Sequence, residues 1–296
     1  MSINVCMNGK NCIMKKTNVF VPDNYVTYQN GRVFIDICNS GCGSACKYCY
    51  SPTCFDAQHL LSIEEIKLIC EYILENYLHK IEVVSLCPNT EPLKSNKSIQ
   101  LVLYIVDFFT NLDCKIQIST KEIIPLYFLD KLNSISKNNI FLNISIPLLE
   151  ESSIIEPFAA SIEERFKNFK KIKLFNHLSS CLYIKPFFNK KKEFPQYINL
   201  INELRIDNVC VGVKFTNSTN NPCVSLYDNV VAKDLFENQI EAILDFITEI
   251  RESTKAKVFG SSICCIKKNY KEKCDIKLYK YNELLCTDCD LERSSL

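Results

Sequence analysis

The chain has 296 residues, of which 47% are hydrophobic and 23% charged, an ordinary composition for a globular protein that buries a full core. Its formal net charge is +1, from 35 Lys and Arg against 34 Asp and Glu, which excludes a strongly basic nucleic-acid coat and an acidic disordered chain. No apolar run reaches the length of a membrane span, and residues 1–16 lack the apolar core of a signal peptide. The sequence therefore predicts a cytoplasmic protein with no membrane partner.

Strand-like and helix-like segments alternate along most of the chain. Short apolar runs predict strands, and apolar residues at helical spacing predict helices. The predicted strands are residues 32–38, 81–86, 115–119, 140–146, 181–184, 209–215 and 257–260. The predicted helices are residues 62–77, 99–109, 125–132, 161–173, 196–204 and 234–253. Ser161 and Glu164 form a capping box that indicates the start of the fourth helix.

Six strand–helix units and a short seventh strand predict an α/β fold with a parallel sheet covered by helices and right-handed crossovers. This order indicates a partial (β/α)6 TIM-like barrel over residues 32–260, preceded by an N-terminal segment, residues 1–31. Residues 261–296 lack the alternation and form a cysteine-rich C-terminal extension. In such folds the chemistry lies at the carboxyl ends of the strands. The residues that follow each strand are therefore the first functional candidates.

The chain contains 18 cysteines. In a large chain without an export signal, metal or iron–sulfur ligation explains grouped cysteines better than disulfides do. Isolated cysteines such as Cys70, Cys114 and Cys181 are expected to be small core residues, and the same interpretation is favoured for Cys38 and Cys54. Two groups of closely spaced cysteines need a different explanation.

The first group is Cys42, Cys46 and Cys49, a C-x3-C-x2-C run directly after the first predicted strand. Three thiolates at this spacing can bind three corners of a [4Fe–4S] cluster, which leaves the fourth iron open to a small molecule. Gly41 and Gly43 permit the tight turn that such wrapping requires. A structural zinc site is the alternative, but zinc usually takes paired cysteines or cysteine with histidine.

With Tyr48 immediately before Cys49, this run is similar to the signature of radical S-adenosylmethionine (radical SAM) enzymes. Thr90-Glu91-Pro92, after the second predicted strand, resembles the motif that binds the amino group of SAM in this superfamily. Residues 118–121, 128–132 and 155–165 resemble segments of its spore photoproduct lyase-like branch. The resemblance covers residues 32–215 in the expected order. It implies the partial barrel of a radical SAM enzyme.

The resemblance also implies a reaction. A reduced cluster passes an electron into SAM, which breaks into methionine and a 5′-deoxyadenosyl radical that removes hydrogen from an unreactive carbon. Carried over by position, the three cysteines ligate the cluster and Tyr48 lies near the adenine. The residues implied for the other parts of SAM are Thr90 and Glu91 for its amino group, and Lys121, Ser145 and Arg165 for its carboxylate and ribose. A carboxylate suits the SAM ammonium and an Arg fork suits its carboxylate, although solvated surface positions are the alternative for Glu91, Lys121 and Arg165.

Cys87 lies in the loop after the second predicted strand, four residues before Glu91. Spore photoproduct lyases use a cysteine in roughly this loop to return a hydrogen atom to the product radical. The resemblance therefore makes Cys87 a candidate catalytic hydrogen donor, although the local sequence differs from theirs.

The second group lies in the C-terminal extension and comprises Cys264, Cys265, Cys274, Cys286 and Cys289. The C-x-x-C spacing at its end is a common metal knuckle, and Cys6 and Cys12 could add ligands. Either an auxiliary iron–sulfur cluster or a structural zinc ion would fit, since both use thiolates. A metal at this place would lie over the mouth of the barrel.

The substrate is left open by the sequence. The branch resemblance favours a nucleic acid and a lyase or repair-type reaction, whereas an auxiliary cluster favours a peptide or small molecule. Basic and aromatic residues alternate over 267–281, and residues 190–192 are lysines, so phosphate binding and a plain solvated face are both open. A non-catalytic iron–sulfur or zinc binding module is the rival to an enzyme. An enzyme of this kind needs a reductant such as flavodoxin or ferredoxin.

Overall fold

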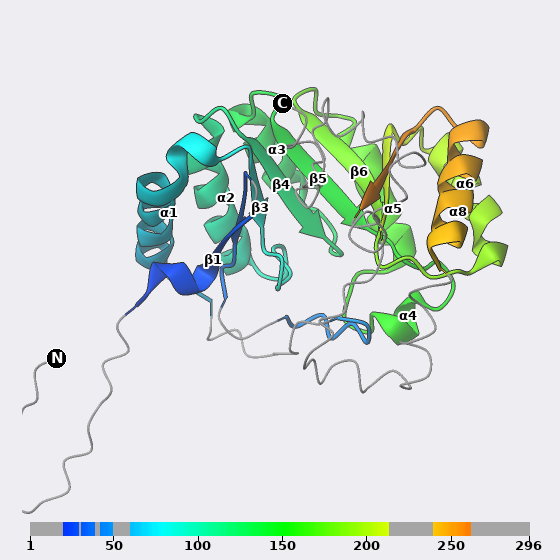
Figure 1. The fold of residues 1–296 in the computed structure, drawn as a ribbon, viewed down its shortest axis with the longest axis horizontal. Coiled ribbons are helices and arrows are strands. Elements are labelled where there is room, and N and C mark those ends of the chain that lie inside the picture. The colour runs from blue at the N-terminus through cyan, green and yellow to red at the C-terminus, as the bar shows by residue number, and fades with distance from the viewer. Residues whose placement is uncertain (1–19, 30, 39–41, 50–59, 213–238, 262–296) are drawn as a thin grey trace, which may run out of the picture.

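One sheet of eight strands organises the computed structural model (Figure 1). The structure describes residues 20–29, 31–38, 42–49, 60–212 and 239–261. The strands follow one another across the sheet in chain order, from β1 to β8. β1 (Val26–Gln29) pairs antiparallel with β2 (Arg32–Ile35), and every later neighbour is parallel. The carboxyl ends of β2 to β8 therefore meet at one edge.

The remaining strands are β3 (Val83–Leu86), β4 (Lys115–Thr120), β5 (Ile140–Ser145), β6 (Leu178–Ile184), β7 (Asn208–Gly212) and β8 (Lys257–Ser261). The helices are α1 (Ile63–Tyr77), α2 (Asn96–Thr110), α3 (Leu126–Ile135), α4 (Ser152–Ile155), α5 (Ile162–Ile172), α6 (Phe194–Glu203) and α8 (Gln239–Ser253). Short 3-10 helices cover Pro22–Tyr25, Leu78–Lys80 and Lys191–Glu193. No helix among these is both long enough and apolar enough to cross a bilayer, in the part of the chain that the structure describes.

The strands present an apolar outer face to the helices. Alternate residues of a strand point to opposite faces of a sheet, so one set of positions faces the helices throughout. These buried residues belong to the main hydrophobic core and include Val33, Val84, Ile116, Ile118, Leu142, Ile144, Leu182 and Ile184. The helices contribute the other half of this core, as Ile66, Ile69 and Ile73 do from α1.

The predicted fold class is confirmed. The seven parallel strands β2 to β8 correspond to the seven predicted strands, and a helix follows in each predicted place that the structure describes. Ser161 caps α5 by accepting a hydrogen bond from the backbone of Glu164, so the predicted capping box is present. β1 and α4 are not predicted, because four residues are too few to show a period.

The predicted division into segments stays a prediction. β1 extends the sheet into the segment predicted as N-terminal, because residues 26–29 pair with β2. Residues 262–296, and with them the whole second cysteine group, lie outside the described residues.

Candidate functional site

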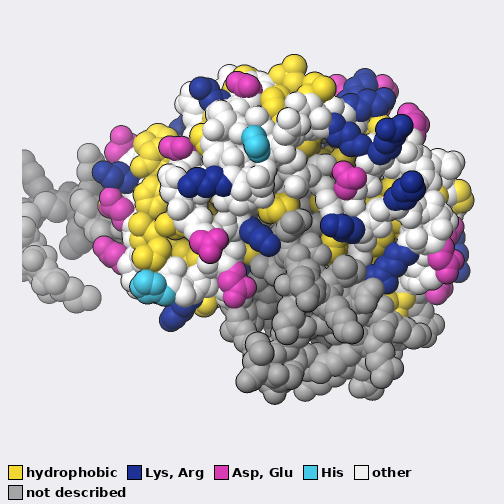
Figure 2. Space-filling view, turned by 90° about the horizontal axis from the view of Figure 1, so that it is seen from above, with side chains coloured by type: hydrophobic (Ala, Val, Ile, Leu, Met, Phe, Trp, Pro, Cys, Tyr) yellow, Lys and Arg dark blue, Asp and Glu magenta, His cyan; other side chains and the backbone are white. Residues whose placement is uncertain are grey.

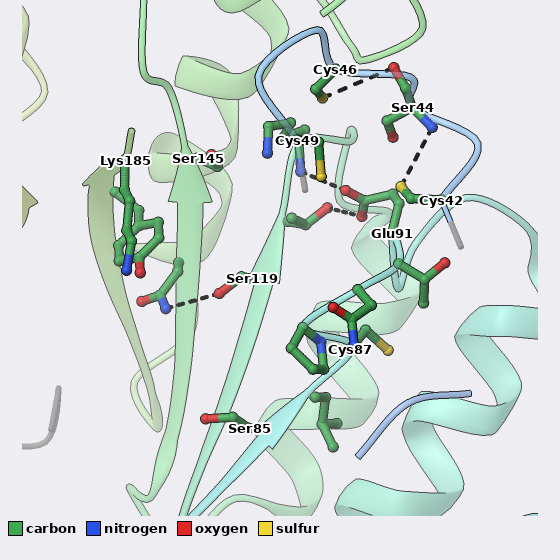
Figure 3. Close-up of a pocket in the computed structure, with 18 of the residues that line it drawn as sticks. Cys42, Ser44, Cys46, Cys49, Ser85, Cys87, Glu91, Ser119, Ser145 and Lys185 are labelled. Atoms are coloured by element: carbon green, nitrogen blue, oxygen red, sulfur yellow. Dashed lines mark hydrogen bonds between the residues drawn. The ribbon is translucent and has the colours of Figure 1, made fainter. Parts of the chain in front are cut away.

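A cavity of about 290 Å³ lies at the carboxyl ends of the first parallel strands (Figure 3). Its walls come from β2 to β6, from the loops that follow β3 and β4, and from the cysteine loop, residues 42–49. Most of the predicted site residues line it together, namely Cys42, Cys46, Tyr48, Cys49, Cys87, Thr90, Glu91, Lys121 and Ser145. Residues about 100 positions apart in the sequence, from Cys42 to Ser145, thus face one space.

The cysteine loop is shaped by its own backbone. The Ser44 N–H donates to Cys42 Sγ at 3.4 Å, the Cys46 thiol donates to the Ser44 carbonyl at 4.0 Å, and Ala45 has a positive φ of 47°. The Lys47 N–H donates to the Ile155 carbonyl at 2.9 Å, which fastens the loop to α4. The three cysteines are half-buried and face the cavity from one side (Figure 3).

Two features of the loop fit a [4Fe–4S] cluster. One is its three thiols, and the other is a buried hydroxyl that lacks a hydrogen-bond partner. Ser44 is 2% exposed, and its hydroxyl has no hydrogen-bond partner among the described residues, although cluster sulfides would accept from it. Burial raises the pKa of Cys46 to about 12, and the charge of Lys121 opposes that rise. No three His, Cys, Asp or Glu side chains among the described residues lie close enough to hold one metal ion. A cluster does not need such convergence, because each thiolate binds a different iron.

Glu156, just after α4, connects several of the predicted residues. Its Oε1 accepts a hydrogen bond from the Tyr48 hydroxyl and lies 3.9 Å from Lys121 Nζ. Its Oε2 lies 2.5 Å from Arg165 Nη1. Burial, and then the charge of Glu156, raise the pKa of Tyr48 well above its usual value. Burial disfavours the charge of Lys121, but negative groups led by Glu156 together raise its pKa, so the lysine stays cationic.

Arg165 is not brought to the cavity. Its guanidinium is fully buried and donates to the carbonyls of Ala160, at 2.7 Å, and Ser145, at 3.0 Å, besides its ion pair with Glu156. The geometry therefore gives no support to the predicted contact between Arg165 and SAM. Arg165 lies on the core-facing side of α5, the helix that begins with the capping box. A guanidinium that is buried there requires several hydrogen-bond acceptors.

Glu91 is held in place by donors from the loop after β3, from the end of β4 and from the loop after β4. Its Oε1 accepts from Thr120 Oγ1 at 2.5 Å and from the Leu93 N–H at 3.2 Å, and its Oε2 accepts from the Lys121 N–H at 2.9 Å. Burial raises its pKa, and the hydrogen bonds from Thr120 and Lys121 oppose that rise. The result is a pre-oriented carboxylate on the cavity wall, where it can accept hydrogen bonds from a ligand cation.

Cys87 has an unusual backbone conformation. Its φ is +57°, in the left-handed region that costs a non-glycine residue about 1–3 kcal/mol and that is enriched at functional sites. The Cys87 N–H donates to the Ile35 carbonyl at 2.8 Å, which fastens the loop to β2. The thiol is 4% exposed, and burial, followed by the charge of Asp36, raises its pKa well above the usual value. Both effects favour the protonated thiol.

Several cavity residues are not among the predicted site residues, and the polar ones on the strands include Arg32, Ser85, Gln117, Ser119 and Asn143. The sequence does carry a signal for some of these residues. Strands of a parallel sheet are expected to be buried on both faces, so polar residues that alternate within predicted strands 115–119 and 140–146 indicate a polar cavity. Cys70, Cys114 and Cys181 are buried, which confirms the prediction that they are core residues.

The predicted lysine run is largely paired. Lys190 Nζ lies 2.7 Å from Glu151 Oε1, and Lys192 forms an ion pair with Glu150. Figure 2 shows basic and acidic side chains interspersed on one face of the molecule rather than segregated. Two of the three lysines in residues 190–192 are therefore already paired with glutamates, which lowers the positive charge that this surface offers to a phosphate. The cysteines at positions 264–289 and the residues 267–281 lie outside the described residues.

No family model matches the sequence, and no curated protein matches it. Solved structures do match its fold. Spore photoproduct lyase complexed with dinucleoside spore photoproduct aligns with a TM-score of 0.57 at 12% identity, over 75% of this chain and 74% of that chain. Streptococcus suis SuiB bound to S-adenosylmethionine aligns with a TM-score of 0.53 at 15% identity, over 83% of this chain and 54% of that chain.

A second SuiB structure, bound to the precursor peptide SuiA, aligns with a TM-score of 0.55 at 15% identity and covers 83% of this chain. The chain spans about half the length of SuiB, since 52% of that protein is covered. At these identities the comparison concerns the fold. It confirms that the predicted fold is similar to that of spore photoproduct lyase and of SuiB.

Proposed function

We propose that the chain is a radical SAM enzyme that binds a [4Fe–4S] cluster through Cys42, Cys46 and Cys49 and binds SAM in the adjoining cavity. One observation carries the proposal: the cysteine loop and the pre-oriented Glu91 carboxylate line the same cavity. A binding module that only holds a metal has no use for a buried carboxylate beside it.

Each side chain of the cavity has a role that suits one part of SAM. Glu91 accepts hydrogen bonds from the SAM ammonium, and Lys121 and Ser145 receive its carboxylate and ribose. Tyr48 lies beside the adenine, with its hydroxyl fixed by Glu156. A reduced cluster held by Cys42, Cys46 and Cys49 would supply the electron for reductive cleavage of SAM to methionine and the 5′-deoxyadenosyl radical, which would take hydrogen from the substrate. The electron comes from a reductant such as flavodoxin or ferredoxin.

Cys87 is proposed as the hydrogen-atom donor to the product radical. A donor of this kind must keep its S–H bond, and the burial that raises the pKa of Cys87 favours the protonated thiol. Its left-handed backbone is a second feature of functional positions.

A nucleic-acid substrate and a lyase or repair-type reaction are favoured for this site. The support is that spore photoproduct lyase, complexed with a dinucleoside photoproduct, is covered over 74% of its length. SuiB, bound to a precursor peptide, supports peptide modification as the second candidate. An auxiliary iron–sulfur cluster or zinc ion at Cys264, Cys265, Cys274, Cys286 and Cys289 stays a prediction.

Anaerobic incubation of the reconstituted chain with SAM and dithionite tests the proposal. We expect 5′-deoxyadenosine and methionine in equal amounts from the parent protein. Replacing Cys42, Cys46 and Cys49 together by Ala should abolish both the cluster absorbance and 5′-deoxyadenosine. The matched control is Cys114→Ala, because Cys114 is buried away from the cavity. Formation of 5′-deoxyadenosine in the triple variant would refute the assignment.

A further inference from the structure

Ser44 lies inside the cysteine loop and buries a hydroxyl that lacks a hydrogen-bond partner. The residue is 2% exposed and lines the cavity together with Cys42, Cys46 and Cys49. Its Oγ has no hydrogen-bond partner among the residues that the structure describes. Buried hydroxyls are nearly always hydrogen-bonded, because burial removes the water that would otherwise bind them. The hydroxyl of Ser44 therefore indicates a bound group that contacts it.

The backbone of Ser44 is directed toward the cysteines. Its N–H donates to Cys42 Sγ at 3.4 Å, and its carbonyl accepts from the Cys46 thiol at 4.0 Å. Ala45, the next residue, has a φ of 47°, in the left-handed region that a non-glycine residue keeps only where its surroundings fix it. Figure 3 shows Ser44 beside Cys42 and Cys46, on the same side of the cavity. The loop thus places Ser44 among the thiols that are proposed to bind the cluster.

The surroundings of Ser44 limit what its hydroxyl can contact. A serine hydroxyl has one O–H donor and two lone pairs that accept. The thiolates of a [4Fe–4S] cluster and its inorganic sulfides are acceptors, and hydrogen bonds to these sulfurs are one of the means by which a protein sets the reduction potential of the cluster. SAM is the other group that the cavity is proposed to bind, so an experiment has to separate these two partners.

We infer that the Ser44 hydroxyl donates a hydrogen bond to a sulfur of the cluster and thereby raises the reduction potential of the cluster. This inference rests on the proposed function, which places the cluster at Cys42, Cys46 and Cys49. Reduction adds one electron, taken from the external reductant, and the added negative charge is shared by iron and sulfur. A donor at a sulfur stabilises the more negative, reduced state more than the oxidised state. Ser44 therefore helps flavodoxin or ferredoxin to deliver the electron that SAM cleavage consumes.

A redox titration of the anaerobic, reconstituted chain tests the inference. Titanium(III) citrate supplies the electrons, and electron paramagnetic resonance measures the reduced cluster in the absence of SAM. In Ser44→Ala the ratio of reduced to oxidised cluster at a given potential should fall about tenfold, which corresponds to a midpoint about 59 mV lower for one electron. Alanine keeps the backbone N–H that donates to Cys42, so this variant loses the hydroxyl alone.

Two further variants show whether the hydroxyl causes the shift. Ser44→Thr retains a hydroxyl at the same position and should restore most of the parent ratio. The matched control is Ser98→Ala. Ser98 is 1% exposed, its hydroxyl donates to the Ser95 carbonyl at 2.8 Å, and it does not line the cavity. This control also loses a buried hydroxyl and should leave the midpoint unchanged.

Ser44→Gly replaces Ser44→Ala if the alanine variant does not hold the cluster, which iron content and absorbance reveal. Loss of iron in both variants, with iron retained in Ser44→Thr, would support the inference, because the hydroxyl is then the group that the iron-binding proteins share. Loss of iron in all three variants would show that position 44 serves packing and would overturn the inference.

An unchanged or raised midpoint in Ser44→Ala, or an equal shift in Ser98→Ala, would also overturn it. If the midpoint is unchanged and calorimetry shows weaker SAM binding, the hydroxyl belongs to SAM instead. Because 5′-deoxyadenosine is measured separately, SAM cleavage by a parent whose midpoint equals that of Ser44→Ala would remove this inference and leave the proposed function intact. A midpoint that falls in Ser44→Ala, in a protein that does not cleave SAM, would do the reverse.

Discussion

The inner face of the sheet carries different side chains in its two halves. On β2 to β5 the inner face carries polar and charged residues around a cavity, as Gln117, Ser119 and Ser145 do. Farther along the sheet, Cys181 on β6, Cys210 on β7 and Phe259 on β8 pack into a small separate cluster, which Phe141 of β5 joins. The first half of the sheet therefore lines the candidate ligand cavity, and the inner face of the second half is mostly packed.

The same comparison separates two kinds of cysteine. Cys181 lies within a strand, is 1% exposed and has its pKa raised well above normal by burial and then by Cys210. Cys42, Cys46 and Cys49 lie on a loop and face a cavity. A cysteine in the middle of a parallel strand faces a packed layer, whereas a cysteine in the loop after the strand can reach a ligand. Position relative to the strand end therefore separates the candidate ligands from the core cysteines.

The largest loss of stability is expected when one partner of the buried ion pair between Arg165 and Glu156 is removed. Arg165→Met leaves Glu156 buried without the cation 2.5 Å from its Oε2, and such changes cost about 3–5 kcal/mol. The free energy of unfolding, from urea titration followed by circular dichroism, should fall by this amount. Arg205→Met, at an exposed position, is the control, and a loss below about 1 kcal/mol for Arg165→Met would contradict the account.

Glu91→Gln should weaken SAM binding by about ten- to a hundredfold, because a hydrogen bond to a charged group contributes about 1.5–3 kcal/mol. Calorimetry on the reconstituted protein measures the affinity, and the cluster absorbance should stay unchanged. Glu122→Gln is the matched control, since Glu122 pairs with Lys94 and does not line the cavity. Equal SAM affinity in Glu91→Gln and parent would remove Glu91 from the site.

The pH dependence of SAM binding is a second test of the role of Glu91. Burial raises the pKa of Glu91 above the usual 4.5, against opposing hydrogen bonds from Thr120 and Lys121. The ionised carboxylate binds the SAM ammonium, so binding is present above the raised pKa and is lost as the pH falls through it. Below that point the affinity should fall about tenfold per pH unit. In Glu91→Gln this part of the profile should be flat, and an unchanged profile in the variant would assign the titration to another group.

The smallest effect is expected from the second half of the sheet. Cys181→Ala removes one buried sulfur and should cost about 1 kcal/mol of unfolding free energy. Iron content and SAM affinity should match those of the parent, whereas Cys46→Ala should lose the cluster. Loss of iron in Cys181→Ala would show that the two halves of the sheet are not separate in function.

The sequence analysis predicts the parts of the site that are local in the chain. The spacing of Cys42, Cys46 and Cys49 is visible within eight residues, and Glu91 follows a recognisable strand. The contact between Tyr48 and Glu156 joins residues 108 positions apart, so no local pattern reveals it. The left-handed backbone of Cys87 depends on how its loop is fastened to β2 and is equally invisible in the sequence.

The polar residues of β4 that line the cavity are visible in the sequence, but their pattern has two interpretations. Gln117 and Ser119 alternate with apolar residues, which is also the pattern of a strand with one face in water. Only the parallel pairing of β4 between β3 and β5 shows that the polar face is turned inward.

SAM is proposed to bind against a cluster held by Cys42, Cys46 and Cys49. Electron paramagnetic resonance of the dithionite-reduced protein, recorded with and without SAM, tests it most directly. The account predicts a reduced [4Fe–4S] signal that changes when SAM is added to the parent and that changes much less at the same SAM concentration in Glu91→Gln. A cluster signal in the parent that SAM leaves unaltered, under conditions where calorimetry shows SAM bound, would contradict it.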